Sequence, residues 1–115
     1  MHELSVTETI LKIALDTGCE ARAKRINAVS LVIGDLTSYV DDSIQFYFDF
    51  LSKGTLAEGA TLKFRREPAL AVCQSCQHQF TVTPPLPPFC PACQAHTLQV
   101  SGGKGFYIES IEVDL

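Results

Sequence analysis

Residues 73–93 read CQSCQHQFTVTPPLPPFCPAC, a stretch that holds four of the five cysteines of this 115-residue chain. They form two Cys-x-x-Cys pairs, Cys73 with Cys76 and Cys90 with Cys93. Such pairs present thiolates from two tight turns, and four sulfurs at this spacing suit the tetrahedral coordination of Zn²⁺. The alternatives are two disulfides or four free thiols. Because four sulfurs leave no coordination position for a substrate, we expect the zinc to be structural.

The composition limits the chain to one ordinary domain, or to one domain with a metal-stabilised annex. No apolar run approaches the roughly 20 residues that a membrane helix needs. The first residues, MHELSVTETI, carry acid where a signal peptide carries base and then an apolar run. We therefore expect a cytoplasmic protein with no membrane contact, and a reducing compartment also favours metal ligation over disulfides.

The charge distribution argues against a nucleic-acid partner. The formal net charge is −4, and the basic residues occur in short pairs such as Lys24-Arg25 and Arg65-Arg66. A zinc ribbon that binds nucleic acid needs a positive surface to neutralise phosphates. A nucleic-acid or transcription accessory module is therefore the alternative function, and a dithiol redox protein is a third class.

Hydrophobic periodicity predicts two helices. The first runs from about residue 3 to residue 19, and Gly18 is expected to mark its end. The second is expected to be capped by Ser38 or Asp41 and to end at Gly54. The apolar face of this second helix is predicted to consist of Val40, Ile44, Tyr47, Phe48 and Leu51.

Three segments are predicted to be strands: 27–36, 60–67 and 105–114. The first is apolar and β-branched, which is typical of a buried strand. The second alternates, with Lys63 and Arg65 on its solvent side. In the third, Ile108 and Ile111 fall on opposite faces, which indicates a bulge or a strand covered on both sides.

Because the cysteines lie between the second and third strands, the zinc module is predicted to be an insertion. The expected fold class is α+β, with two helices on one face of a three-stranded sheet and an inserted four-cysteine module. The expected domains are an α/β domain of residues 1–68 and 103–115 and a zinc-binding domain of residues 69–102. The segment 84–88, PPLPP, is interpreted as a stiff connector, the alternative being a proline-rich ligand for an aromatic groove.

The N-terminal residues Met1, His2 and Glu3 form a second candidate metal site. A free α-amine, an imidazole and the adjacent backbone amides supply four nitrogens in a plane, the arrangement that Ni²⁺ and Cu²⁺ prefer. An N-terminal histidine is more often simply solvated, so these residues alone leave both interpretations open. No metalloprotease motif, phosphate loop, nucleophile elbow or catalytic carboxylate pair occurs in the sequence, so we expect no enzyme activity.

The motifs also keep a recognisable order. The chain starts with MHELS, has IGDL at residues 33–36 and GTLAEGATL at residues 54–62, continues with the two cysteine pairs, and closes with IESIEV at residues 108–113. This order resembles the hydrogenase-maturation nickel metallochaperones of the HypA/HybF family over the full length. The resemblance implies nickel delivery to the large subunit of [NiFe]-hydrogenase with a partner GTPase. Some members also serve urease, which implies urease maturation proteins as further partners.

The resemblance also implies two sets of metal ligands. Nickel, the transported metal, is expected on the Met1 amine, the His2 imidazole and the backbone amides of His2 and Glu3. Structural zinc is expected on the four sulfurs of Cys73, Cys76, Cys90 and Cys93.

Some residues depart from the pattern or stand outside it. Gln77 and Gln94 occupy positions where many relatives have glycine, so the turns must tolerate a positive φ or adopt another form. His78 and His96 are near enough to replace a thiolate, although exposed polar residues are the preferred interpretation. Cys19 is interpreted as a small buried hydrophobic residue.

Overall fold

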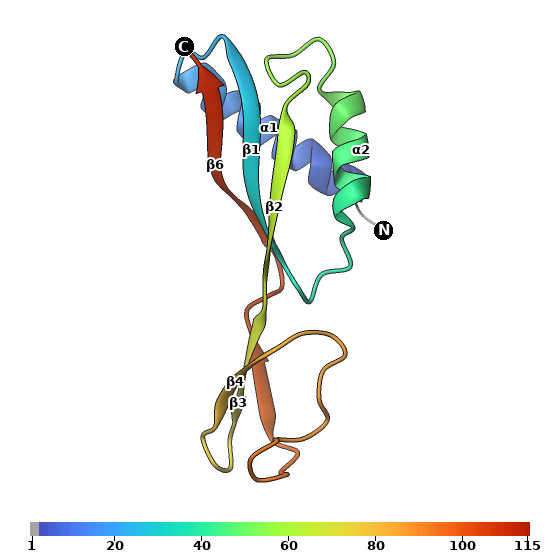
Figure 1. Ribbon diagram of the computed structural model, residues 1–115, viewed down its shortest axis with the longest axis vertical. Helices are drawn as coiled ribbons and strands as arrows, with labels where there is room; N and C mark the ends of the chain where they lie inside the picture. The colour runs from blue at the N-terminus through green and yellow to red at the C-terminus, as the bar shows by residue number, and fades with distance from the viewer. Residues whose placement is uncertain (1–2) are drawn as a thin grey trace. The chain divides into compact units, whose positions relative to one another are not determined.

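The computed structural model describes residues 3–115 and divides the chain into two compact units (Figure 1). The first unit combines Met1–Val32, Ser38–Arg65 and Tyr107–Leu115. The second unit combines Ile33–Thr37 and Arg66–Phe106. None of the helices within residues 3–115 is both long enough and apolar enough to cross a bilayer.

The first unit contains two helices and most of a three-stranded sheet. Its elements are α1 (Glu3–Glu20), β1 (Arg25–Gly34), α2 (Asp41–Leu51), β2 (Thr61–Glu67) and β6 (Phe106–Asp114). The strand order is β2-β1-β6, and β6 runs opposite to β1 and β2 (Figure 1). The predicted α+β class is therefore confirmed.

The buried side chains of α1 and α2 follow the predicted periodicity. Ile10 and Ala14 of α1 and Ile44 and Phe48 of α2 are fully buried, and the two helices contact each other. On β2, Leu62 is buried while Lys63 and Arg65 are exposed, as the alternation predicted. The fully buried residues contributed by β1 include Ile26, Val29, Leu31 and Val32.

The start of α2 differs from the expectation of a Ser38 or Asp41 cap. The N-cap residue is Val40, which has extended backbone angles and makes no side-chain capping hydrogen bond. Its N–H instead donates to Oε2 of Glu3, 3.1 Å away and distant in sequence. Val40 itself is 52% exposed, so it does not belong to the apolar face on which it was expected.

Gly18 does not end α1, contrary to the prediction. The helix continues to Glu20, and Arg22 takes the left-handed conformation at φ 56°. The N–H of Ala23 donates to the carbonyl of Gly18 and that of Arg22 to the carbonyl of Cys19, which is a Schellman motif. Gly18 is buried against β1. A Cβ at this position would lie only 2.9 Å from Cδ1 of Ile26, so the glycine permits close packing of α1 on β1.

Cys19 is exposed, so the prediction that it is buried was wrong. It follows Gly18, whose side of the helix faces Ile26. A one-residue step rotates a helical side chain by about 100°. Cys19 therefore lies away from the buried stripe that Ala14 and Gly18 share.

The edge strand β6 changes the side on which its apolar residues lie. Ile108 and Ile111 are both half-buried, and two consecutive exposed residues, Glu109 and Ser110, separate them. A shift of one residue in an alternating pattern is what a bulge produces. The exposure pattern therefore favours the bulge over a strand covered on both sides.

The second unit contains a small sheet that the sequence did not lead us to expect. Its strands are β3 (Ala69–Cys73), β4 (Gln79–Val82) and β5 (Leu98–Ser101), in the antiparallel order β4-β3-β5. The buried core consists of Ala69, Ala71 and Val82, with Leu36, Phe80 and Val100 packed against it. This core is small, because β4 and β5 have only four residues each and contribute few apolar side chains, while the buried residues of β3 in the core are alanines.

Two glycines let chain segments of the second unit approach closely. An ideal Cβ on Gly34 would lie 2.2 Å from the carbonyl carbon and oxygen of Gly103, a distance that no side chain tolerates. The N–H of Leu36 donates to the Gly103 carbonyl at 2.7 Å, and Leu36 packs on the small core. The IGDL segment therefore belongs to the second unit by its contacts.

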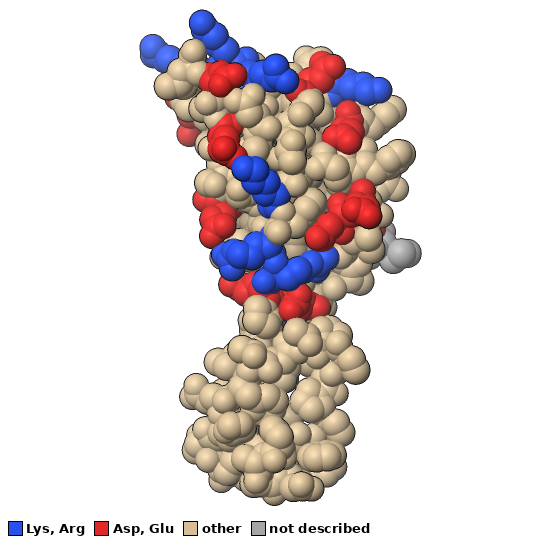
Figure 2. All heavy atoms as spheres, viewed as in Figure 1, with Lys and Arg blue, Asp and Glu red and all other residues tan. Residues whose placement is uncertain are grey.

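Charged side chains are unevenly distributed along the chain. Lys63 pairs with Glu112 at 2.7 Å and Arg65 with Glu109 at 2.9 Å. These pairs are exposed, so each contributes at most about 1 kcal/mol. By contrast, residues 68–103 contain no Lys, Arg, Asp or Glu, and Figure 2 shows an extended surface without blue or red atoms.

Candidate metal centre

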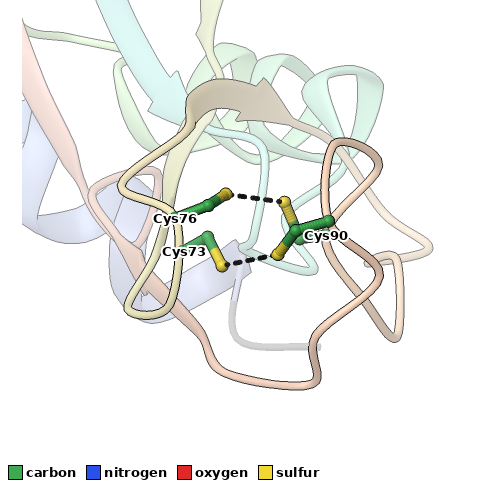
Figure 3. Close-up of side chains that lie close together, drawn as sticks. Cys73, Cys76 and Cys90 are labelled. Atoms are coloured by element: carbon green, nitrogen blue, oxygen red, sulfur yellow. Dashed lines mark hydrogen bonds between the residues drawn. The ribbon is translucent and has the colours of Figure 1, made fainter.

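The structure brings the four predicted cysteine sulfurs together. They lie within 4.8 Å of one another, with 3.6 Å between Sγ of Cys73 and Cys93 and 3.7 Å between Sγ of Cys76 and Cys90. Figure 3 shows Cys76 and Cys90 turned toward each other from separate chain segments. All five cysteines are unpaired, so the disulfide alternative is wrong.

These distances match a tetrahedral metal site. A metal with bonds of about 2.3 Å to four sulfurs separates neighbouring sulfurs by about 3.8 Å, whereas a disulfide needs about 2.05 Å. The cavity between the sulfurs is therefore the right size for Zn²⁺. Thiolates are soft ligands, and a closed set of four suits a structural metal.

The two cysteine pairs are held by the same hydrogen-bond pattern. In the first turn, the N–H of Gln77 donates to the carbonyl of Cys73, and the N–H of Cys73 donates to the carbonyl of His78. In the second turn, the N–H of Gln94 donates to the carbonyl of Cys90, and the N–H of Cys90 donates to the carbonyl of Ala95. All four distances lie between 2.8 and 2.9 Å. The backbone therefore forms two equivalent turns that aim sulfurs at one point.

Both turns place a glutamine in the left-handed region. The φ angle is 66° at Gln77 and 67° at Gln94, so the turns keep the backbone form for which glycine is usual. A non-glycine residue in this region costs roughly 1–2 kcal/mol. Gln77 offsets part of this cost, because its side-chain amide donates to the carbonyl of Gln74 at 3.1 Å.

Substitutions at Gln94 should separate these backbone effects. We expect Gln94→Gly to keep or improve metal affinity, because glycine adopts a positive φ without steric cost. Gln94→Val should weaken the affinity about tenfold, because a β-branched residue at this φ is strongly strained. Competition titration with a zinc chelator measures both variants. Wild-type affinity in the valine variant would contradict the role of the turn.

The first cysteine of each pair is the buried one. Cys73 and Cys90 are completely buried, whereas Cys76 and Cys93 are exposed. Cys73 also lies at the end of β3, and its sulfur is 3.7 Å from the Thr97 hydroxyl. The sequence spacing predicted the four sulfurs but gave no indication of this difference, which depends on the small core beside β3.

Local hydrogen bonds and burial shift the pKa values of Cys73, Cys76 and Cys90 in different directions. The backbone N–H of Cys76 is the main cause that lowers the pKa of Cys73 to about 6. At Cys76, an otherwise exposed residue, the N–H of His78 lowers the pKa, but partial desolvation of the thiol and the three neighbouring sulfurs outweigh it and raise the pKa to about 12. Burial raises the pKa of Cys90, but N–H groups of Cys93 and Ala92 outweigh it, so the net shift is downward.

Metal affinity should therefore fall as the pH falls. At neutral pH the Cys76 thiol keeps its proton without metal, so metal binding must displace that proton. Each displaced proton weakens binding by about tenfold per unit of pH decrease. The slope should steepen below pH 6, where the Cys73 thiolate also takes up a proton. Chelator competition between about pH 8 and pH 5.5 measures this slope, and a constant affinity would contradict the assignment.

The two nearby histidines lie outside the sulfur cluster. His78 and His96 are both exposed, as the preferred interpretation held. The ring of His78 stacks on Phe80 at 5.3 Å, and that of His96 lies 5.9 Å from Phe89. Each imidazole is thus in contact with an aromatic ring beside the turn, and within residues 3–115 the ligand cluster consists of sulfurs alone.

Of the N-terminal candidates, only Glu3 is among the described residues. Met1 and His2 lie outside them. Glu3 is 8% exposed, and its carboxylate accepts the hydrogen bond from the N-cap of α2. The sequence analysis gave a role only to the backbone amide of Glu3. It missed the contact between the Glu3 carboxylate and Val40, because the two residues are distant in sequence.

Comparison with known proteins identifies the family. A family model described as "Hydrogenase/urease nickel incorporation, metallochaperone, hypA" matches residues 1–113. The chain belongs to the HypA family. This match confirms the resemblance seen in the sequence. It also confirms the predicted function, a nickel metallochaperone for hydrogenase maturation. Proteins of this family are metallochaperones and not enzymes.

Curated relatives match over nearly the whole chain. A hydrogenase maturation factor HypA from Dehalococcoides mccartyi is 45% identical over 99% of this chain and 95% of its own length. The protein of the same name from Geobacter metallireducens is 39% identical over 99% of this chain and its whole length. The alignments therefore span nearly the whole length of both relatives.

Solved structures support the same fold. The solution structure of the nickel metallochaperone HypA from Helicobacter pylori matches with a TM-score of 0.67 at 20% identity, covering 99% of this chain and 98% of that one. A second solution structure of a HypA protein matches with a TM-score of 0.70 at 21% identity, covering 98% and 96%. At these identities the likeness concerns the fold.

Proposed function

We propose that this HypA protein binds Ni²⁺ at its N-terminus and delivers it to the large subunit of [NiFe]-hydrogenase. The ligands are the Met1 amine, the His2 imidazole and the backbone amides of His2 and Glu3. The observation that carries the proposal is the match to a nickel-incorporation family, which includes the N-terminal residues of this chain. Amine, imidazole and amide nitrogens also form the ligand set that suits square-planar Ni²⁺.

The second metal is zinc, bound by Cys73, Cys76, Cys90 and Cys93. Its role is structural. The core cluster of the second unit has only three buried apolar residues, two of them alanines, so this unit needs an additional source of stability. A closed set of four thiolates provides that stability and does not release its metal readily.

The two metals divide the chain into two functional parts. Residues 1–68 and 103–115 form the nickel-binding α/β domain, and residues 69–102 form the zinc-binding domain. The contact units support a division of this kind, although they assign the IGDL segment to the second unit. We place this activity in the cytoplasm, where thiolate metal sites persist in reduced form.

The partners follow from nickel delivery. The large subunit should contact the N-terminal end and the adjacent face of α1, and a nickel-handling GTPase should act with this chain. Glu3 supports the location, because its carboxylate ties the start of α1 to the N-cap of α2. Urease maturation proteins are further partners, in keeping with the urease in the family description.

A complementation experiment tests delivery. In a hydrogenase-producing cell that lacks its own HypA, the wild-type chain should restore nickel in the large subunit, and His2→Ala should not. His96→Ala is the matched control, because it removes an imidazole from an exposed position beside the other metal centre. Co-purification of the wild-type chain with neither the large subunit nor the GTPase would count against the proposal.

The alternative, a nucleic-acid module, finds no support in the charges. Residues 68–103 offer no Lys or Arg to neutralise phosphates, although they contain the zinc-ribbon-like part of the chain. A salt-dependent shift on DNA or RNA is therefore not expected.

A further inference from the structure

The loop that follows α2, residues 54–59 with the sequence GTLAEG, contributes no ligand to the sulfur cluster. It also lies away from the start of α1. Cδ1 of Leu56 is 3.9 Å from the position of a Cβ on Gly18, near the last turn of that helix. A helix of 18 residues is about 27 Å long, so this loop and Glu3 are at opposite ends of α1. The motif therefore has no role in either metal centre.

Internal hydrogen bonds hold this loop in one conformation. Its first and last residues, Gly54 and Gly59, are both in the left-handed region, at φ 80° and 79°. The N–H of Gly54 donates to Oε1 of Glu58 at 2.9 Å. The Thr55 hydroxyl accepts from the N–H of Ala57 at 3.1 Å. The surface that the loop presents is therefore largely preformed.

Two basic residues lie beside the loop. The N–H of Ile26 donates to the carbonyl of Leu56 at 2.9 Å, which brings the preceding residues Lys24 and Arg25 next to the loop. A Cβ on Gly59 would lie 3.5 Å from Nη2 of Arg25. Both segments lie at the same end of the first unit as the C-terminus (Figure 1), and Figure 2 shows blue atoms gathered along that end.

The basic pair and the loop enclose an open pocket of about 660 Å³. We call it the loop pocket. Lys24 and Arg25 are both exposed, and no carboxylate among residues 3–115 forms an ion pair with either of them. Glu58 is the acid that lines the pocket, and its carboxylate accepts the hydrogen bond from Gly54. The loop pocket therefore keeps an excess of positive charge in a chain whose net charge is −4.

We propose that the loop pocket binds the phosphate group of a small molecule. A phosphate monoester carries a charge of about −1.5 to −2 at pH 7, which balances two cations, whereas a single carboxylate balances one. The guanidinium of Arg25 can donate two parallel N–H bonds to phosphate oxygens, and the ammonium of Lys24 adds a point charge. The pocket is larger than one phosphate, so the remainder of the ligand has room beside Leu56.

NMR titration of the zinc-loaded full-length chain with inorganic diphosphate tests the site. The amide signals of Gly54 and Gly59 should shift and reach saturation. Arg25→Gln should weaken binding about tenfold or more, because it removes charged hydrogen-bond donors. Arg65→Gln is the matched control, because it changes the net charge equally but removes a guanidinium already paired with Glu109. Equal weakening in both variants, or no saturation by about 10 mM diphosphate, would overturn the proposal.

Glu58→Gln gives a result in the opposite direction. The glutamine amide oxygen can still accept the hydrogen bond from Gly54, so the loop should keep its conformation. The change removes a negative charge from the wall of the pocket, and like charges repel. Diphosphate should therefore bind several-fold more tightly to this variant. An unchanged or weaker affinity would place the anion outside the loop pocket.

Two further ligands identify what carries the phosphate. A nucleoside diphosphate that binds at least about tenfold more tightly than inorganic diphosphate would assign the pocket to a nucleotide, and equal affinities would assign it to the free phosphate group. Citrate that binds as tightly as diphosphate would overturn the choice of phosphate over carboxylate. Arg25→Gln should leave nickel and zinc binding unchanged, because Arg25 belongs to neither metal centre. Loss of either metal would show that the variant disturbs more than this pocket and would contradict the assignment.

Discussion

The Cys90→Ser protein is expected to contain no zinc at the four-sulfur centre and to lose the fold of residues 66–106. Cys90 is completely buried, and its sulfur lies 3.7 Å from that of Cys76, so the change removes a central ligand that the exposed histidines do not replace. Structural zinc sites contribute apparent binding free energies of about 10–16 kcal/mol in small domains. The small core around Ala71 does not offset a loss of that size.

Elemental analysis and amide NMR spectra measure this outcome. Signals from α1, α2 and β1 should persist, because their buried residues belong to the first unit. Cys19→Ser is the matched control, since Cys19 is exposed and should leave the zinc content at one per chain. Retention of zinc by Cys90→Ser would contradict the expectation. So would unchanged signals from residues 66–106 after treatment with a strong chelator.

The second large effect concerns nickel. The untagged chain should bind Ni²⁺ as a square-planar, diamagnetic complex, and His2→Ala or one added N-terminal residue should abolish that complex. Binding displaces protons from the amine, the imidazole and the amides, so the affinity should rise with pH across the neutral and mildly alkaline range. Cu²⁺ should bind the same atoms more tightly, as the general order of metal affinities requires.

Absorption spectra during nickel titration measure this site. His78→Ala and His96→Ala are the controls, because both residues are exposed and lie beside the zinc centre rather than at the N-terminus. The zinc content should stay at one per chain in every variant. An N-terminally extended chain that bound nickel with an unchanged spectrum would make the N-terminal assignment untenable.

The parts of the structure that follow from local patterns were predictable. The periodicity around Ile44 and Phe48 located α2, and alternation around Leu62 located β2. The spacing of the cysteines predicted the sulfur cluster, because each Cys-x-x-Cys turn is closed by hydrogen bonds within six residues. At Gln77 and Gln94 the sequence left a positive φ or another form of turn open, and the structure has the positive φ.

The errors concern features that depend on residues distant in sequence. Gly18 was taken for a helix end, but its role is to make room for Ile26 on another element. The N-cap of α2 was assigned to Ser38 or Asp41, but Val40 is held by Glu3 instead. The strands β3, β4 and β5 were missed because their cross-strand partners, such as Ala71 with Phe80 and Val100, define them more than their own composition does.

Because residues 68–103 contain no Lys, Arg, Asp or Glu, a bound metal would dominate the electrostatics of this segment. A divalent metal held by four thiolates would carry roughly two net negative charges, which would be the main source of a long-range electric field in the segment. A macromolecule that approaches the segment therefore meets hydrogen-bonding and apolar groups whose attraction is nearly independent of ionic strength.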